Sequence, residues 1–226
     1  MTYTGVPWEM AERYYQEGAD ELCFLGITAS RERRNTMTKV IEKTVEKVFV
    51  PITVGGGIKS VEDARKVFGA GADKVSINTA ALQRPKLISE LSQVFGAQAV
   101  VVAIDAKKQG AQWDCSIFGG KKFTDKGAVD WAKEAEALGA GEILLTSMDR
   151  DGTKQGFDLE LIKAVSQAVN IPVIASGGAG RMQDFADVLQ QGEADAVLAA
   201  SVFHYGKYSI REVKKFLEKR GIEVRK

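Results

Sequence analysis

The chain repeats itself at a spacing of 121 residues, and this repeat restricts its fold more than any other feature. The segment AERYYQEGADELCFL, which begins at Ala11, aligns without a gap with AKEAEALGAGEILLT, which begins at Ala132. At the same offset VPITVGGG aligns with IPVIASGG, and after one inserted residue near Glu193, ADKVSINTA aligns with ADAVLAASV. Each half therefore has the order helix, strand, helix, strand, helix, strand.

The strands are short apolar runs that alternate with amphipathic helical stretches. The seven runs expected to form strands are Glu21–Leu25, Pro51–Val54, Lys74–Ile77, Ala99–Ile104, Glu142–Thr146, Pro172–Ala175 and Ala196–Ala200. Strict alternation predicts a parallel α/β sheet, either doubly wound or closed into a barrel. Two similar halves favour a TIM-type (βα)8 barrel, which typically needs about 200 residues or more. We expect one domain over 1–226, with half-barrels of about 1–97 and 98–226.

One strand of the second half has no copy in the first half. The run Ala99–Ile104 leads into Asp105, and subtracting 121 from 105 points to a position before Met1. We therefore expect a barrel truncated to about seven strands, with two open edges. Unpaired backbone at an edge is unfavourable, so we expect the chain to self-associate, as a dimer, through these edges. A closed seven-strand barrel, or a gap partly filled by Met1–Val6, are the alternatives.

Composition excludes several classes of protein. The formal net charge of the 226 residues is +1, which gives no general attraction for nucleic acid or an anionic membrane. The sequence has neither an apolar run of about 18 residues nor a signal-peptide pattern. Cys23 and Cys115 stand alone and are expected to be buried thiols of a reducing compartment, so we expect a cytoplasmic protein. His204 is the only histidine, which argues against a metal site.

Glycine runs follow two strands at equivalent positions of the repeat. Gly55–Gly57 follow one strand, and Gly177, Gly178 and Gly180 follow its partner. Glycine lets the backbone approach an anion closely, and the N–H groups at the start of the next helix can bind it. A tight turn would explain a single run. Two matching runs favour two phosphate sites, on opposite sides of one barrel face, for a long substrate with a phosphate at each end.

Polar residues at the strand ends are the candidates for chemistry, because function in such barrels lies at that face. Asp105 closes an apolar strand and is a candidate general acid or base. The loop after Thr146 is expected to shape the pocket. Trp113, in a polar loop, either covers the pocket or faces solvent, and the basic loop Ser30–Thr36 either is a solvated surface or attracts anions. Asp149 and Arg150 are either an exposed pair or part of the site, and His204 is expected to be structural.

Five stretches of the chain resemble one enzyme family. They are TVGGGIKSVEDA, GADKVSINTAA, VVVAIDAK, GAGEILLTSMDRDGTKQGFD and the pair IASGGAG and AASVFH. They look like the cyclase subunit of imidazole glycerol phosphate synthase, of histidine biosynthesis, over about Pro7 to Arg225. The sister isomerase of that pathway shares the two-halved barrel and DRDGT, but SINTAA and GEILLTS look more like the cyclase.

The resemblance implies a reaction and the residues that perform it. Ammonia from a partner glutaminase would react with a bis-phosphate formimino-ribulosyl aminoimidazole carboxamide ribotide, which is cyclised and cleaved without metal or organic cofactor. Asp105 matches one of the two catalytic aspartates of the family. The residues that match or complete the two phosphate sites and the pocket are Gly55, Gly56, Gly57, Asn78, Thr79, Thr146, Asp151, Gly152, Ser176, Gly177, Gly178, Ala199 and Ser201. At the opposite face Glu21, Lys74 and Glu142 match the ammonia gate, and Asp73 matches a contact to the glutaminase.

Two departures from the family pattern predict impaired turnover. The first strand is absent, and with it the other catalytic aspartate, a substrate-loop lysine and the gate arginine. Gly26 stands where the family usually carries an aspartate that orders the active face. Three hypotheses follow. The chain is a cyclase whose turnover is impaired unless a second chain donates the missing part, or it is a non-catalytic truncated or engineered barrel that self-associates, or it is the sister isomerase.

Overall fold

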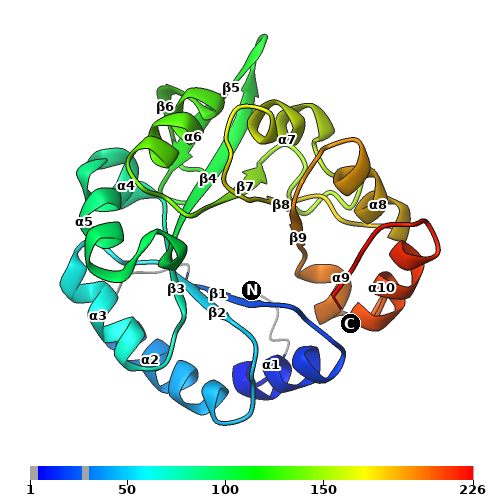
Figure 1. Ribbon diagram of the computed structural model, residues 1–226, viewed down its shortest axis with the longest axis horizontal. Coiled ribbons are helices and arrows are strands. Elements are labelled where there is room, and N and C mark those ends of the chain that lie inside the picture. Colours follow the sequence, from blue (N-terminus) through cyan, green and yellow to red (C-terminus); the bar gives the residue numbers. More distant parts are fainter. Residues whose placement is uncertain (1–4, 27–30, 226) are drawn as a thin grey trace.

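The chain forms a curved, mainly parallel sheet covered on its outside by helices (Figure 1). The computed structural model describes residues 5–26 and 31–225. Seven parallel strands follow the order of the chain: β1 (Leu22–Leu25), β2 (Ile52–Gly55), β3 (Lys74–Ile77), β4 (Val100–Gln109), β7 (Glu142–Ser147), β8 (Val173–Ser176) and β9 (Ala196–Leu198). Within the described residues β1 and β9 are the two edges of this sheet. The arrangement is that of a TIM-type barrel truncated to seven parallel strands, as the repeat predicts.

The helices lie around the sheet in the order of the chain. They are α1 (Pro7–Gln16), α2 (Arg31–Val45), α3 (Val61–Gly69), α4 (Thr79–Gln83), α5 (Lys86–Phe95), the 3-10 turn Ala97–Ala99, α6 (Ala128–Ala137), α7 (Leu159–Ser166), α8 (Met182–Gln190), α9 (Ser201–His204) and α10 (Ile210–Glu218). The N-caps of α3 and α10 show why they begin where they do. Ser60 accepts a hydrogen bond from the Asp63 N–H, and Ser209 forms a reciprocal capping box with Glu212.

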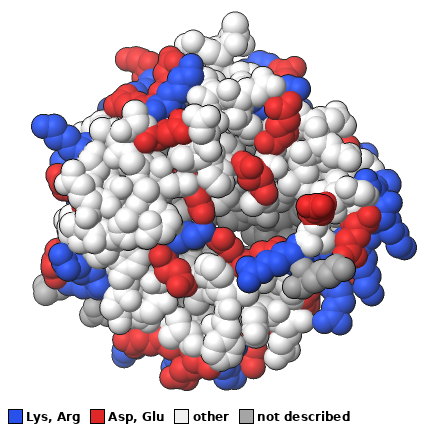
Figure 2. Space-filling view, viewed as in Figure 1, with Lys and Arg blue, Asp and Glu red and all other residues white. Residues whose placement is uncertain are grey.

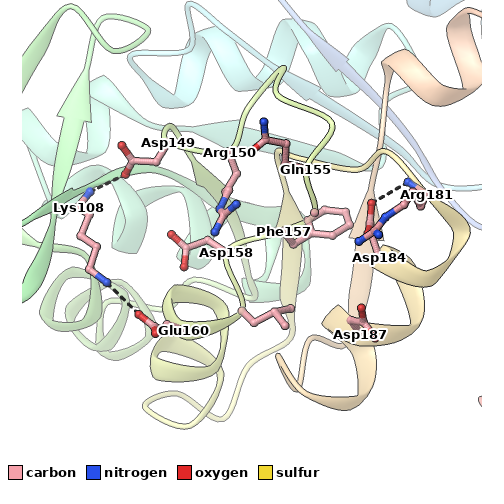
Figure 3. Close-up of a pocket in the computed structure, with 12 residues that line it drawn as sticks. Lys108, Asp149, Arg150, Gln155, Phe157, Asp158, Glu160, Arg181, Asp184 and Asp187 are labelled. Atoms are coloured by element: carbon pink, nitrogen blue, oxygen red, sulfur yellow. Dashed lines mark hydrogen bonds and ion pairs between the residues drawn. The ribbon is translucent and has the colours of Figure 1, made fainter.

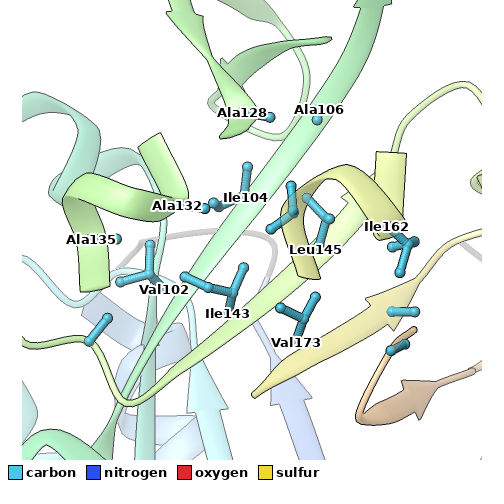
Figure 4. Close-up of a cluster of buried hydrophobic side chains, with 14 of the residues drawn as sticks. Val102, Ile104, Ala106, Ala128, Ala132, Ala135, Ile143, Leu145, Ile162 and Val173 are labelled. Carbon is cyan, nitrogen blue, oxygen red and sulfur yellow. The ribbon is translucent and has the colours of Figure 1, made fainter. Parts of the chain in front are cut away.

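The main core lies between the sheet and the helices (Figure 4). Alternate residues of β4 and β7, such as Val102, Ile104 and Leu145, are fully buried on this side. Helix α6 presents the small side chains of Ala132 and Ala135 to them, so the helix can lie close to the strands. Complete burial of a large aliphatic side chain is worth about 1.5–3 kcal/mol, so this layer holds the barrel wall together.

Backbone hydrogen bonds reproduce the sequence repeat. Asp73 donates its N–H to the carbonyl of Ile52 at 2.9 Å, and its carboxylate accepts the Ile52 N–H at 2.8 Å. Asp195 and Val173, the corresponding residues of the other half, make the same two bonds at 3.0 Å and 2.8 Å. The alignment of the two halves therefore describes a real structural duplication.

Two predictions about loops are wrong. A β-hairpin, β5 (Gln112–Ile117) and β6 (Lys122–Gly127), is paired with an extension of β4 that continues to Gln109. Trp113 therefore lies in a strand. The expected basic loop at Ser30–Thr36 is also wrong from Arg31 onward, because those residues begin α2; Ser30 lies outside the described residues. The stretch has no glycine or proline to stop a helix, and its arginines and glutamate are good helix formers.

The helical layer is joined between the first and the last helices. Arg13 of α1 donates to the carbonyl of Phe203 in α9 at 3.0 Å, and Lys214 of α10 forms an ion pair with Asp20 at 2.6 Å. Tyr14 of α1 is hydrogen-bonded to Nδ1 of His204, which confirms the structural interpretation of this histidine. The helices thus meet where the strands β1 and β9 do not. Self-association through those strand edges stays a prediction.

No helix in the described part of the chain is long and apolar enough to cross a membrane.

Candidate functional site

Asp105 lies where β4 meets its two parallel neighbours at their carboxyl ends. It pairs in register with Thr146 of β7, and Asn78 follows directly after β3. The Asn78 Nδ2 donates to Asp105 Oδ2 at 2.9 Å. Burial raises the pKa of the Asp105 carboxyl, and the negative charge of Asp151 raises it further, whereas the hydrogen bond from Asn78 opposes both effects. A raised pKa makes this carboxyl a better proton acceptor than an ordinary aspartate, as a general acid or base requires.

The side chain of Asn78 has one free acceptor in this site. Its Oδ1 is buried and has no hydrogen-bond partner among the described residues. A buried acceptor without a partner costs about 1–3 kcal/mol. A ligand that brings an N–H or O–H group to this point would remove that cost. Asn78 therefore both orients Asp105 and offers a contact to a ligand beside it.

The glycine loops after β2 and β8 have the same backbone form. Gly56 and Gly177, which correspond in the repeat, have φ values of +103° and +88°. A Cβ on Gly56 would lie 2.2 Å from the carbonyl oxygen of Gly26, and a Cβ on Gly177 would lie 2.9 Å from that of Ser147. Each loop thus packs against a carbonyl at the carboxyl end of the preceding strand, and only glycine fits there. This packing gives the two runs a structural reason.

The helices after these loops begin with carboxylates that accept backbone N–H groups. Asp63 of α3 accepts the N–H of Lys59 at 3.1 Å, and Asp184 of α8 accepts the N–H groups of Gly180 and Arg181 at 3.0 Å and 2.7 Å. Their own carboxylates thus bind N–H groups at the starts of α3 and α8, and phosphate binding by these helices stays a prediction. By contrast, the short helices α4 and α9, which follow β3 and β9, have no side-chain cap.

Comparison with protein families decides what kind of barrel this is. Residues 1–209 match the model of a family described as histidine biosynthesis protein. The chain belongs to this family.

Most of the expected site residues of this histidine biosynthesis barrel lie at the carboxyl ends of the strands. Thr146, the last residue but one of β7, pairs with Ser176 at the end of β8, and Ser201 begins α9. Asp151 and Gly152 lie exposed in the loop after β7. Gly55 is the buried last residue of β2, and Ala199, which follows β9, is partly buried and packs against the core.

The hairpin β5–β6 is a part of the site that the sequence prediction missed. The N–H of Phe118, at its turn, donates to the Thr79 Oγ1 at 3.0 Å, so the hairpin reaches one expected phosphate site. Trp113 of β5 is partly buried, and its Nε1 donates to Asp158 at 3.3 Å. The signal was present: residues 112–117 and 122–127 flank the glycines at 119 and 120, as strands flank a hairpin turn.

An ion cluster closes the opposite end of the sheet. Lys74 Nζ donates to both carboxylate oxygens of Glu21 at 2.9 Å and to Glu142 at 2.5 Å. Burial lowers the pKa of Lys74, but the hydrogen bonds to the two carboxylates outweigh it, so the pKa lies above its ordinary value. The second carboxylate oxygen of Glu142, Oε2, is buried without a partner among the described residues. The three residues predicted to form a gate are therefore in contact, whereas Asp73 bonds to β2 beside them.

A separate cavity of about 670 Å³ lies beside the starts of α7 and α8 (Figure 3). Its walls include Arg150 and Asp149. The Asp149 carboxylate accepts a hydrogen bond from the backbone N–H of Lys108 at 2.8 Å. Arg181 and Asp184 form an ion pair at its other side. The residues expected to bind phosphate, and Asp105, do not line this cavity. Asp149 and Arg150 thus line this cavity, and Arg150 also lies beside Gly178 of the loop after β8.

Proposed function

We propose that this histidine biosynthesis protein is of the cyclase type of imidazole glycerol phosphate synthase. The observation that carries the proposal is Asp105, held by Asn78 at the strand ends between two glycine loops of equal form. The loops suit the two phosphates of one long substrate, and the carboxyl group suits proton transfer at its centre. The motifs SINTAA and GEILLTS favour the cyclase over the sister isomerase.

The residues have distinct roles in this proposal. The loops around Gly56 and Gly177 hold the two phosphates, with Thr79 and Ser201 as further donors. Asp105, with its raised pKa, transfers protons during the ammonia-dependent ring closure and cleavage. At the other end of the barrel, Lys74 and its two glutamates control the passage of ammonia from a glutaminase that docks on that face.

We expect turnover by this chain alone to be strongly impaired. Among the described parallel strands, only β4 carries a carboxylate, Asp105, at the face where the strands end in the site. Protonation of one side of the substrate and deprotonation of the other require two groups with different proton affinities. A single carboxyl must perform both steps in turn, which lowers the rate of each cycle.

The test is ammonium-dependent turnover of the formimino-ribulosyl bis-phosphate substrate by the full chain. Asp105→Asn is expected to abolish any turnover, since an amide cannot exchange the proton. Asp125→Asn, which changes an exposed carboxylate of β6, is the matched control and is expected to keep wild-type turnover. Turnover that survives in Asp105→Asn would contradict the proposed role, and turnover of the isomerase substrate instead would replace the cyclase with its sister enzyme.

A further inference from the structure

A chain of hydrogen bonds joins α1 to α9. The Arg13 guanidinium donates to the Tyr14 hydroxyl at 3.1 Å, and this hydroxyl is hydrogen-bonded to Nδ1 of His204. The same guanidinium donates to the carbonyl of Phe203 at 3.0 Å. The rings of Tyr14 and His204 also lie close together, with their centroids 5.6 Å apart. Residues that are 190 positions apart in the sequence thus meet in one contact.

The donors and acceptors of this contact favour a neutral His204. Arg13 can only donate, so the Tyr14 oxygen accepts from it and keeps its own proton for Nδ1. An imidazole nitrogen accepts only when it carries no proton. Burial lowers the pKa of His204, and the positive charge of Arg13 lowers it further. The contact therefore needs the neutral imidazole, with its proton on Nε2.

The charged groups around the contact come from three segments. On α1, Glu17 forms an ion pair with Arg13 at 3.7 Å. At the start of α10, Arg211 donates to a carbonyl at the end of α1 at 3.1 Å, and Figure 2 shows Lys and Arg side chains gathered where Figure 1 places α10. Lys207 follows α9 directly in the next turn. A proton on His204 would add a positive charge to a region that is already rich in cations.

Helix α9 is a single turn that carries Ser201 at its start. The His204 N–H donates to the carbonyl of Ala200 at 2.8 Å, and the Tyr205 N–H donates to that of Ser201 at 3.1 Å. Val202 is buried and fixes the turn to the core. The side chain of His204 fixes the same turn to α1. A change at His204 is therefore felt at Ser201.

The glycine loop after β8 is tied to the same segment. Lys207 Nζ donates to the carbonyl of Gly180 at 2.6 Å, and Gly180 lies in the loop that contains Gly177. Ser201 is thus held between two contacts, one to this loop through Lys207 and one to α1 through His204. Together they set the position of the Ser201 hydroxyl relative to the loop.

The other half of the barrel shows that the fold itself does not require a polar contact here. Tyr14 corresponds to Ala135 in the repeat, and His204 corresponds to Leu82 after the inserted residue. Ala135 is fully buried, and Leu82 packs against the main core. Apolar side chains are thus sufficient at these places, so the hydrogen-bonded pair has a reason other than helix packing.

We propose that Tyr14 and neutral His204 are positioning residues that hold Ser201 toward the anion bound by the Gly177 loop, and that a proton on His204 weakens this hold. The inference rests on the proposed function, in which Ser201 and this loop bind one phosphate of the substrate. By linkage, an anion that binds best with neutral His204 must make His204 harder to protonate. Charge attraction alone does the opposite, because a nearby anion raises the pKa of an imidazole. The sign of the pKa change therefore separates positioning from simple attraction.

The first experiment is a proton NMR titration of the full chain, in which His204, the only histidine, gives a single imidazole to follow. The probe is inorganic sulfate at constant ionic strength, whose charge stays constant over the range of about pH 5 to 8 in which a histidine titrates. We expect sulfate to lower the pKa of His204 in the wild type. In Tyr14→Phe, which lacks the hydroxyl that joins α1 to His204, sulfate should raise this pKa or leave it unchanged.

Two further variants act as controls in the same titration. Ser201→Ala should remove the effect of sulfate on the pKa of His204, because the positioned hydroxyl is gone. Tyr15→Phe changes the neighbouring tyrosine, which packs against Phe49, and should behave as the wild type. An equal rise of the His204 pKa with sulfate in the wild type and in Tyr14→Phe would overturn the inference.

Equilibrium dialysis of sulfate measures the coupling from the side of the ligand, and the binding that Ser201→Ala removes defines the site. At about pH 7.5, Tyr14→Phe and His204→Ala should weaken binding at this site by about two- to tenfold, the effect of one lost hydrogen bond. His204→Asn keeps an acceptor near the place of Nδ1 and does not titrate, so it should bind as the wild type at this pH and lose the pH dependence. Circular dichroism checks that each variant keeps the wild-type fold.

The outcomes separate this inference from the proposed reaction, because sulfate binding needs no turnover. Linkage without turnover of the cyclase substrate would contradict only the proposed reaction. Turnover without linkage would contradict only the positioning role of Tyr14 and His204. Absence of sulfate binding, or unchanged affinity in Tyr14→Phe and His204→Ala, would also overturn the inference.

Discussion

The substitution Gly56→Ala tests why glycine stands in the loops of the candidate site. Gly56 has φ +103°, and its added Cβ would lie 2.2 Å from the carbonyl oxygen of Gly26 and 2.9 Å from its carbonyl carbon. Gly152, in the loop after β7, also has a positive φ, +74°, but a Cβ there would meet no atom within 4 Å. The two substitutions thus share the backbone strain and differ in the clash.

The magnitudes follow from these two terms. A left-handed backbone costs an alanine roughly 1–2 kcal/mol, which is the whole effect expected for Gly152→Ala. Overpacking against backbone that must shift adds about 1–3 kcal/mol, so Gly56→Ala should lose about 2–5 kcal/mol. In a chain of this size each kcal/mol lowers the melting temperature by about 2–4 °C. Gly177→Ala, with its Cβ 2.9 Å from the Ser147 carbonyl oxygen, should fall between the other two.

The assay is urea unfolding at pH 7 for the three variants and the wild type. Both the midpoint and the slope of the free energy of unfolding against urea concentration are measured. An unchanged slope would mean that a shifted midpoint reflects the stability of the folded state. Gly152→Ala is expected to be the least destabilised variant, Gly177→Ala the next, and Gly56→Ala the most destabilised. If Gly56→Ala were no less stable than Gly152→Ala, the close approach to Gly26 would not be the reason for glycine at this position.

Two further predictions concern charged groups away from the loops. Lys74→Met leaves the mostly buried Glu142 without its cation and should lower the free energy of unfolding in urea at neutral pH by about 3 kcal/mol. The control Lys66→Met, at an exposed lysine, should change it by less than about 0.5 kcal/mol. Equal effects of the two substitutions would contradict the role of the Lys74 cluster. Burial, and then the charge of Arg13, lower the pKa of His204 below its ordinary 6.5, so folding disfavours its protonation and the chain should lose stability as the pH falls from 7.5 to 5. The His204→Asn variant should lose part of this pH dependence of stability. An unchanged pH dependence would contradict the role given to His204.

The sequence alone was enough for the order of the strands and for the duplicated architecture. Apolar runs of four to six residues can be recognised without tertiary contacts, because every strand of a helix-covered parallel sheet must be apolar on both faces. The offset of 121 residues then matched β2 with β8, and the offset of 122 after the insertion near Glu193 matched β3 with β9. The bonds of Asp73 and Asp195 confirm this correspondence. The sequence also indicated Asp105, since a carboxylate that ends such a strand must reach the site.

Only the tertiary structure decided what surrounds these residues. The hydrogen bond from Asn78 to Asp105 joins two strands that are separate in the sequence, and the raised pKa of Asp105 depends on burial that no local pattern encodes. The carboxylates of Asp63 and Asp184 bind N–H groups at the starts of α3 and α8. Likewise, the contact of α1 with α10 joins the two ends of the described chain, and no local pattern indicates it. Propensity and periodicity act along the chain, whereas these features depend on distances between segments that only the folded barrel brings together.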